Sequence, residues 1–452
     1  MKRMDRRDFL KAGGLAALGL VAGSPRIFQG KLLGAAPPRP RKLLFIFQRG
    51  GNDGVNTLIP RGDPEYNQQN RPTLFIDPSE GLDLGNGFAQ LHPAMSPLLE
   101  VYNSQSLNGI PGPGNLAVLH RIGYQGQSQS HFDSQQFWEN GIPGKPNLEE
   151  GMIYRQVAQT LDPQMNHLAA ISLSSSQMVA LKGTIPLPTV ANTQSFTLSG
   201  TTAKVKKFLG ALPTTPSGQD GTGILGAYGG SKDIDGQLNR ALVYDSGLVL
   251  ADAVQTIGDA VAQGPYTPEN GASYPDGSFG QKLQQAAMLF KRTPVQVLGA
   301  NLGGWDLHTA QGGARGNHAN LLGTLAKGIQ ALWLDLRDQW QDLVIVTMTE
   351  FGRTSKENGS KGTDHAYACV ICVAGGPVKG GVYNCDASTW SAGDLFSQDG
   401  RYVKHRTDYR TVFWEIFTRH FGDAPDLVES VIPGYTQAAA ARPQDFAFLG
   451  FL

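Results

Sequence analysis

Short runs of consecutive apolar residues, each ending in a polar loop, constrain the fold of this chain more than any other feature. Leu43 to Phe47 and Leu343 to Met348 contain no charged residue, which is typical of strands buried on both faces. The first run leads into the glycine-rich segment Gln48 to Gly54 and the second into Thr349 to Thr354. Strands of this kind belong to parallel sheets, in which helices connect one strand to the next.

Other segments continue this rhythm of strands and helices. Further strands are predicted at Leu116 to Ile122, Val295 to Leu298 and Val370 to Val373, and helices at 151–160, 203–211, Phe279 to Phe290, Asn320 to Arg337, Asp408 to His420 and from about His131. The fold class is therefore α/β, with a mainly parallel central sheet covered by helices on both faces. We expect a single domain over residues 37–452, with a Ser/Thr/Gly-rich insertion at about 172–240.

The N-terminal segment predicts export. Residues 1–11 are basic and contain the twin-arginine pattern Arg6-Arg7-Asp8-Phe9-Leu10-Lys11, and a Gly/Ala-rich apolar stretch follows from Ala12 to Gly23. That stretch is too short for a stable membrane span, so residues 1–36 are predicted to be a signal peptide and linker. The expected location is the periplasm or the extracellular space, with the twin-arginine translocase as a partner during export and no membrane span in the mature protein.

Composition and cysteine content exclude several classes of protein. Lysine plus arginine and aspartate plus glutamate both number 38, so nothing in the charge balance suggests a nucleic acid partner. Three cysteines are too few for a disulfide-stapled scaffold. Cys369 and Cys372 lie in an apolar run that is typical of a strand, where residues three apart point to opposite faces and cannot share a metal. A disulfide from Cys385 to one of them stays open.

Polar residues that can bind a metal follow the predicted strands. Because ligands bind at the carboxyl ends of strands in open α/β sheets, four such segments are expected at one edge of the sheet. Carboxylates and imidazoles are ligands for divalent metals. The segments are Gly50-Gly51-Asn52-Asp53, Gly304-Trp305-Asp306-Leu307-His308, Thr349-Glu350-Phe351-Gly352-Arg353-Thr354 and Gly362-Thr363-Asp364-His365.

On these motifs, together with the twin-arginine start, the chain resembles a family of uncharacterised exported bacterial proteins in the alkaline phosphatase-like (sulfatase-like) superfamily. The resemblance implies an alkaline phosphatase-like fold and one or two divalent ions, of zinc, calcium, magnesium or manganese. It implies Asp53 as a ligand of one metal, and Asp306, His308 and His365 as further ligands. Glu350 and Asp364 belong to the same expected metal site.

The resemblance also implies a nucleophile at a helix start after a strand. Ser130 matches that position, with Ser128 as the reserve, although Ser130 could instead serve only as the helix N-cap. No cysteine lies near Ser130, so a formylglycine mechanism is not supported. Arg353 is the candidate for gripping the oxygens of an ester, or else forms a salt bridge to Glu350 or Glu357.

Two departures from the superfamily pattern leave the function open. Asp306 and His308 are closer in sequence than the corresponding pair of the phosphatases, and Glu350-Phe351 stands where a consecutive aspartate and histidine are expected. The leading hypothesis is an exported metal-dependent hydrolase of a phosphate or sulfate ester, acting on a small molecule or a glycan. The alternatives are a non-catalytic envelope or glycan-binding protein with a degenerate metal site, and a transferase acting on a surface polysaccharide.

Overall fold

The computed structural model describes residues 40–452 except 105–113, 162–165, 167, 197–209, 211–221 and 224–237. The chain divides into two units, Met1–Pro40 and Arg41–Leu452, and all the helices and strands given below belong to the second. The twin-arginine segment, the predicted helix at 203–211 apart from Gly210, and most of the predicted insertion lie outside the described residues. No helix in the described ranges has the length and apolar character that crossing a membrane requires.

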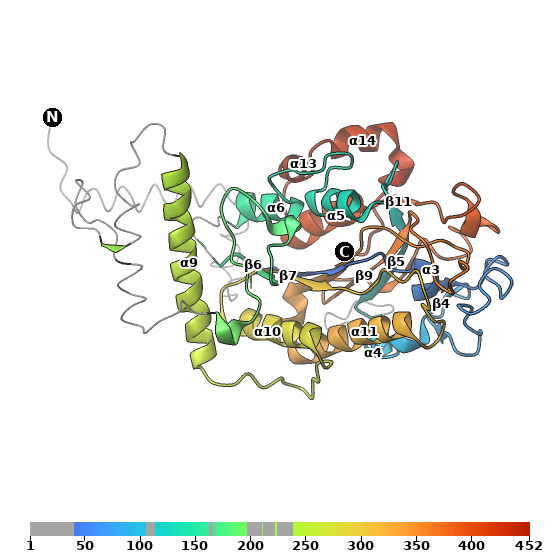
Figure 1. The fold of residues 1–452 in the computed structure, drawn as a ribbon, viewed down its shortest axis with the longest axis horizontal. Helices are drawn as coiled ribbons and strands as arrows, with labels where there is room; N and C mark the ends of the chain where they lie inside the picture. Colours follow the sequence, from blue (N-terminus) through green and yellow to red (C-terminus); the bar gives the residue numbers. More distant parts are fainter. Residues whose placement is uncertain are drawn as a thin grey trace, which may run out of the picture. The chain divides into compact units, whose positions relative to one another are not determined.

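The core of the fold is an eight-stranded, mostly parallel sheet (Figure 1). Its order is β10-β5-β9-β8-β1-β7-β6, and β11 pairs with β5 off this path. Among the described pairings of this sheet, only those of β9 with its neighbours β5 and β8 are antiparallel. The strands are β1 Lys42–Gln48, β5 Leu116–Gly123, β6 Ala170–Leu173, β7 Val297–Leu302, β8 Leu343–Met348, β9 Cys369–Gly375, β10 Gly381–Tyr383 and β11 Thr407–Asp408.

Helices and a small second sheet complete the described structure. The second sheet is antiparallel, in the order β2-β4-β3, with β2 Leu58–Pro60, β3 Leu82–Asp83 and β4 Ala89–Leu91. The α-helices are α3 Gly54–Thr57, α4 Leu98–Asn103, α5 His131–Asn140, α6 Met152–Thr160, α9 Leu238–Ala262, α10 Ser278–Arg292, α11 Asn317–Asp335, α12 Tyr409–Glu415, α13 Pro425–Val431 and α14 Tyr435–Ala441. A π-helix, Ile416–Phe421, continues α12.

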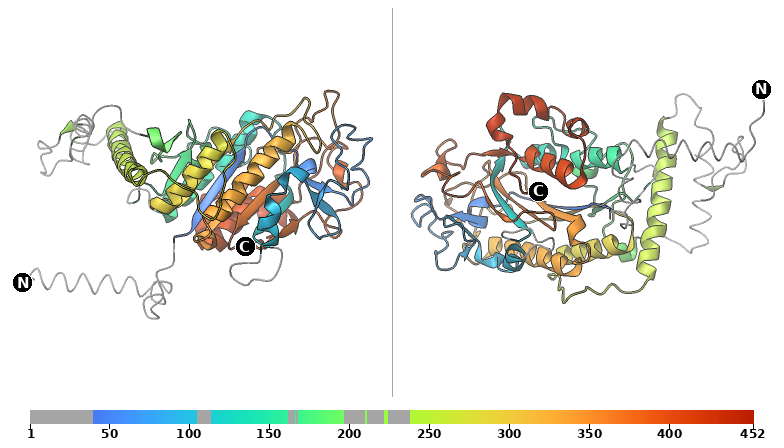
Figure 2. Two further views of the ribbon diagram at one scale, coloured as in Figure 1. Left: turned by 90° about the horizontal axis from the view of Figure 1, so that it is seen from below. Right: turned by 180° about the vertical axis from the view of Figure 1, so that it is seen from behind.

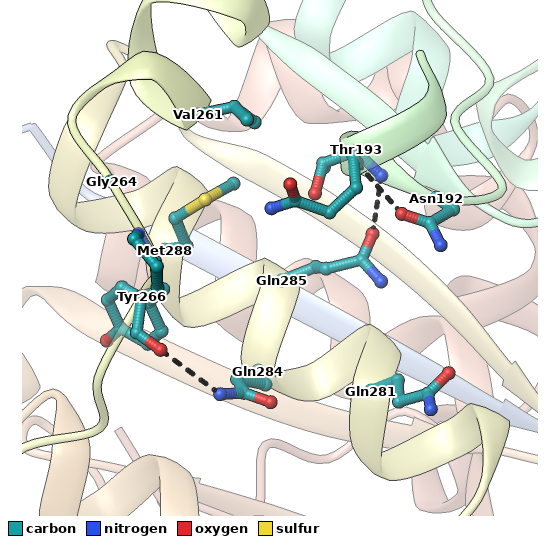
Figure 3. A pocket seen from close by; sticks show the side chains of 11 residues that line it. Asn192, Thr193, Val261, Gly264, Tyr266, Gln281, Gln284, Gln285 and Met288 are labelled. Carbon is teal, nitrogen blue, oxygen red and sulfur yellow. Dashed lines mark hydrogen bonds between the residues drawn. The ribbon is translucent and has the colours of Figure 1, made fainter.

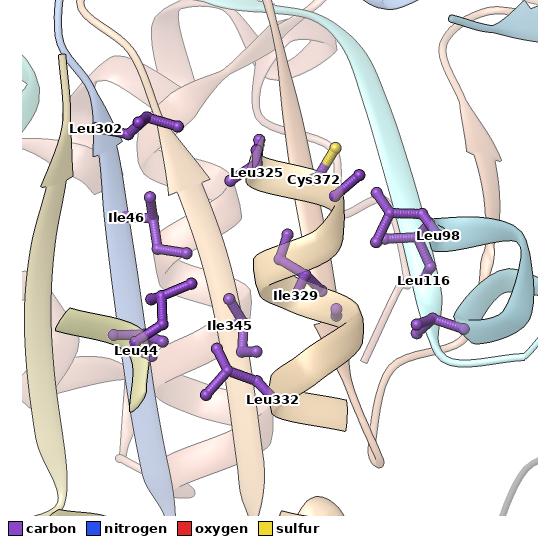
Figure 4. Close-up of a cluster of buried hydrophobic side chains, with 14 of the residues drawn as sticks. Leu44, Ile46, Leu98, Leu116, Leu302, Leu325, Ile329, Leu332, Ile345 and Cys372 are labelled. Atoms are coloured by element: carbon purple, nitrogen blue, oxygen red, sulfur yellow. The ribbon is translucent and has the colours of Figure 1, made fainter. Parts of the chain in front are cut away.

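Alternate residues of the central strands enter two separate hydrophobic clusters. Leu44 and Ile46 of β1 belong to one cluster, which contains the apolar faces of α10 and α11 (Figure 4). Leu43, Phe45 and Phe47 belong to the other, with residues of α5, α6, α12 and α13. Figures 1 and 2 show these two groups of helices lying on either side of the strands. The alternation follows from the two-residue period of a strand, so a strand with apolar residues throughout fills both clusters.

The strongest sequence predictions agree with this fold. The five predicted strands correspond to β1, β5, β7, β8 and β9, although β7 begins at Val297 rather than at Val295. Cys369 and Cys372 are free and buried on β9, and they fall in different clusters, as their spacing predicts. Cys385 is also free, so the disulfide that stayed open is not formed.

The direction of β9 changes one expectation. The segment Gly362 to His365 was grouped with segments that follow buried strands, but it precedes β9. Because β9 runs against β8, the start of β9 lies at the edge of the sheet where β8 ends. Asp364 and His365 therefore lie at the expected edge because they precede the start of β9, not because they follow the end of a strand.

Candidate metal centre

Three imidazole rings surround the carboxylate of Asp306. The Nε2 atoms of His308 and His365 lie 3.0 and 3.2 Å from Asp306 Oδ1, and Nε2 of His131 lies 3.4 Å from Oδ2. The Nε2 atoms of His308 and His365 are only 2.9 Å apart. Ligand atoms of His131, Asp306 and His365 all lie within 4.8 Å of one another, close enough to share one ion.

The other nitrogen of each ring is held by an oxygen acceptor. Nδ1 of His308 lies 3.0 Å from Asp364 Oδ1, and Nδ1 of His365 lies 2.8 Å from the carbonyl oxygen of Gln129. Nδ1 of His131 lies 2.9 Å from Glu350 Oε1. An oxygen of this kind accepts the ring proton, so a neutral ring carries its hydrogen on Nδ1 and a lone pair on Nε2. This arrangement is the one that orients histidines toward metals.

The groups around the rings keep the nearby carboxylates ionised. Burial alone would raise the pKa of Asp306, but the hydrogen bond and the positive charge of Arg353 lower it to about 2. Burial would likewise raise the pKa of Glu350, yet hydrogen bonds from His131 and Gln135 lower it below its ordinary value. The pKa of His131 is raised, first by its hydrogen bond to Glu350. Ionised carboxylates therefore face the rings at neutral pH.

The donor set fits a divalent cation. Three Nε2 atoms converge on the ionised carboxylate of Asp306, whose Oδ1 also accepts from Arg353, and imidazole nitrogens with a carboxylate oxygen are ligands that divalent ions accept. Nε2 of His131 is buried and has no hydrogen-bond partner among the described residues. An imidazole nitrogen in this position can serve as a metal ligand.

Arg353 is buried and holds the carboxylate of Asp306 in position. Its side chain is about 1% exposed, its Nη2 lies 2.6 Å from Asp306 Oδ1, and the guanidinium also donates to the carbonyl oxygens of Gly50, Gly51, Trp305 and Thr363. Its carboxylate partner is thus Asp306, not Glu350 or Glu357, the two partners considered from the sequence. A guanidinium used in this way positions Asp306 and has little capacity left for an ester.

Asp53 belongs to a second network. Its Oδ2 accepts from Arg71 Nη1 at 2.7 Å and from Gln311 Nε2 at 2.7 Å, while Oδ1 caps helix α3. Burial would raise the pKa of Asp53, but the charge and hydrogen bond of Arg71 lower it to about 2. A metal at this carboxylate would have to displace the guanidinium of Arg71. The geometry therefore does not support Asp53 as a metal ligand, and that role stays a prediction.

Ser130 is the N-cap of helix α5. Its Oγ accepts from the amide of Asp133 at 3.4 Å, and its own amide donates to Ser128 Oγ at 3.1 Å. Ser130 therefore acts as a helix cap, which was the alternative role considered for it. A catalytic role for Ser130 or Ser128 stays a prediction.

His131 is the member of the centre that the sequence motifs missed. It is the first residue of α5, directly after the N-cap, and its ring packs against Phe351 and His365 with centroids 4.9 and 4.4 Å apart. The available signal was a histidine at a helix start after a buried strand, at the edge where the other ligands gather. Phe351, which replaces an expected imidazole, thus lies against two of the rings.

Fold and centre together define the class: an α/β protein with a histidine–aspartate centre at the edge where the parallel strands end. The model of a family described as a protein of unknown function, DUF1501, matches residues 250–423. That range contains Asp306, His308, Glu350, Asp364 and His365 but not His131. A search of curated proteins finds no significant match.

Among solved structures, the chain is weakly similar to the alkaline phosphatase from the Antarctic bacterium TAB5. The match has 9% identity, covers 77% of this chain and 96% of that one, and has a TM-score of 0.29. A point mutant of the same phosphatase with magnesium bound in its M3 site matches with 10% identity over 77% and 95% of the two chains, at a TM-score of 0.27.

Proposed function

We propose that this protein is a hydrolase of phosphate or sulfate esters that depends on one divalent ion held by His131, His308, His365 and Asp306. The observation that carries the proposal is the convergence of three Nε2 atoms on one ionised carboxylate. Three nitrogens and one oxygen suit zinc or another borderline ion, whereas calcium and magnesium prefer oxygen ligands. When bound, such an ion supplies stabilisation of the negative charge that develops on a phosphoryl or sulfuryl group.

Groups of the chain itself hold this arrangement. Glu350 and Asp364 orient the rings of His131 and His308, and Arg353 orients Asp306. A cavity of about 170 Å³ adjoins Asp364 and is lined by two cations, Lys356 and Arg401, and by a second acid, Glu357.

Metal content and turnover test the proposal together. Protein purified without added metal is expected to contain about one zinc or similar ion per chain by elemental analysis. Turnover is then screened on aryl phosphates and aryl sulfates with added zinc, manganese, magnesium or calcium. His365→Ala should lose both the ion and the activity, while the control His405→Gln, which alters a histidine outside the centre, should keep both. A chain that neither retains nor binds any of these ions contradicts the proposal.

A second candidate is a non-catalytic protein in which the ion has a structural role. The observation that favours it is the use of Ser130 as a cap and of Asp53 as the partner of Arg71. Under this alternative the ion is retained, but turnover is absent on every ester of the screen and removal of the ion lowers the melting temperature.

Export through the twin-arginine pathway is part of the same proposal. It is supported by the sequence of residues 6–11. Changing Arg6 and Arg7 to lysine should leave the precursor in the cytoplasm, as measured by fractionation and immunoblotting. An equal periplasmic yield from the double variant would contradict it.

A further inference from the structure

A separate cavity of about 460 Å³ lies between the 3-10 turn Thr193–Ser195, the end of α9 with the loop that follows, and α10 (Figure 3). Its volume falls in the range of small-molecule pockets, about 300–1,000 Å³. It shares no lining residue with the candidate metal centre.

The lining of this cavity is polar but uncharged. None of its lining residues is an acid, a base or a histidine, and five carry carboxamides: Asn192, Gln194, Gln281, Gln284 and Gln285. No lining side chain offers an opposite charge to a charged ligand, which would lose part of its hydration here. The occupant that fits is therefore neutral and rich in groups that both donate and accept hydrogen bonds.

Several of these polar groups are fixed but not saturated. Gln285 Oε1 accepts from the amide of Thr193 at 2.8 Å, which leaves the amide hydrogens of Gln285 for a ligand. Gln284 Nε2 donates to the carbonyl oxygen of Tyr266 at 3.5 Å, which leaves its Oε1 as an acceptor. Oγ1 of Thr193 is buried and has no partner among the described residues. Hydroxyl groups can satisfy both the donors and the acceptors of this set.

One wall of the cavity is apolar and held in place. Tyr266 donates its hydroxyl to Asp335, with both carboxylate oxygens at 2.8 Å, and Asp335 also accepts from Tyr274 and Lys291. The Tyr266 ring and the side chain of Met288 line the cavity beside the carboxamides. An aromatic ring that is fixed before binding loses little conformational freedom on binding.

We propose that this cavity binds one uncharged saccharide unit. The hydroxyls of a neutral sugar match the carboxamides and Thr193 Oγ1, and the carbon–hydrogen face of its ring matches Tyr266 and Met288. The inference does not depend on the proposed hydrolase activity.

Calorimetric titration of the full chain tests this inference, with glucose, galactose, mannose, N-acetylglucosamine, maltose and cellobiose as probes. At least one of them should bind with a Kd in the millimolar range. Gln281→Ala and Gln284→Ala should each weaken that binding up to about tenfold, as expected for loss of one hydrogen bond. The matched control is Gln255→Ala on α9, whose carboxamide donates to Asp259 at 2.8 Å outside the cavity lining.

Three outcomes would overturn the inference. One is that no probe binds at concentrations of about 10 mM. Another is that the double variant at Gln281 and Gln284 binds as the unaltered chain does, with an equal melting temperature. The third is that glucuronic acid or glucosamine binds more tightly than the neutral sugars, which would show a charged ligand. Because metal content and ester turnover are measured separately, failure here leaves the proposed function untouched.

Discussion

At the scale of single residues, carboxylates outside the candidate ligand set hold the rings of the candidate metal centre. Glu350 holds Nδ1 of His131 and also accepts from the amide of Gly50 at 2.8 Å and from Gln135 at 2.9 Å. Partners of this kind fix the ring and raise its basicity, and their loss costs about 10–100-fold in metal affinity.

Glu350→Gln is therefore expected to weaken zinc binding by about 10–100-fold without removing the ion site. Competition with a chromophoric chelator measures the affinity. Glu357→Gln is the matched control, because Glu357 lies on the same loop but accepts from the amides of Thr73 and Leu74. An equal loss in both variants would mean that the effect is general to the loop.

Arg353 makes a second prediction at this scale. Arg353→Lys should destabilise the fold by about 3 kcal/mol, because a lysine cannot satisfy several buried carbonyl oxygens and Asp306 at once. Urea unfolding measures the free energy, with Arg401→Lys as the control on an exposed arginine. A loss below about 0.5 kcal/mol would show that the contacts of Arg353 contribute little.

Sequence motifs found most of the candidate site at the level of residues. Asp306, His308, Asp364 and His365 were predicted together because each lies in a polar segment beside a buried strand. Asp53 lies in a similar segment, but its carboxylate binds Arg71. No local sequence pattern predicts a contact with an arginine eighteen residues later. His131 was missed for a related reason, since its partners also come from other parts of the chain.

At the scale of elements, helix α5 carries His131 into the centre. Ser130→Ala should lower stability by about 1 kcal/mol through loss of the cap and leave any turnover nearly intact. Ser130→Asp, which retains a capping oxygen, should restore the stability. Loss of turnover in Ser130→Ala at an unchanged melting temperature would instead identify Ser130 as the nucleophile.

Apolar runs predicted β1, β5, β8 and β9 well because these strands are buried on both faces. The sequence did not predict the antiparallel direction of β9, since a continuous apolar run reads the same in either direction. It also did not predict β10 and β11, which have three and two residues and owe their pairing to the neighbouring strand β5.

At the scale of the whole molecule, several buried histidines set the response to acid. Burial lowers the pKa of His92 and His420 to about 4 and that of His120 and His318 to about 3. The unfolded chain, with an ordinary histidine pKa near 6.5, therefore binds more protons than the folded chain. Stability is full above that value and is lost as the pH falls toward 4.

The free energy of unfolding, measured with urea, is accordingly expected to fall between pH 7 and pH 5. His420→Gln should reduce this fall by about 1–2 kcal/mol, because glutamine does not titrate and its amide can still donate to the carbonyl oxygen of Lys42. Identical pH dependence in the two proteins would show that His420 takes up no proton on unfolding.

The pairing of β5 with β9 has a consequence for how the protein matures. These strands come from distant parts of the chain, and they bring His365 against Gln129, 236 residues away in sequence. Closing so long a loop costs entropy that only the assembled sheet repays. A growing or half-folded chain thus has no complete coordination sphere, so ion uptake should mark the end of folding. The amount of ion bound per mole of protein would then measure the fraction of correctly folded molecules in a preparation.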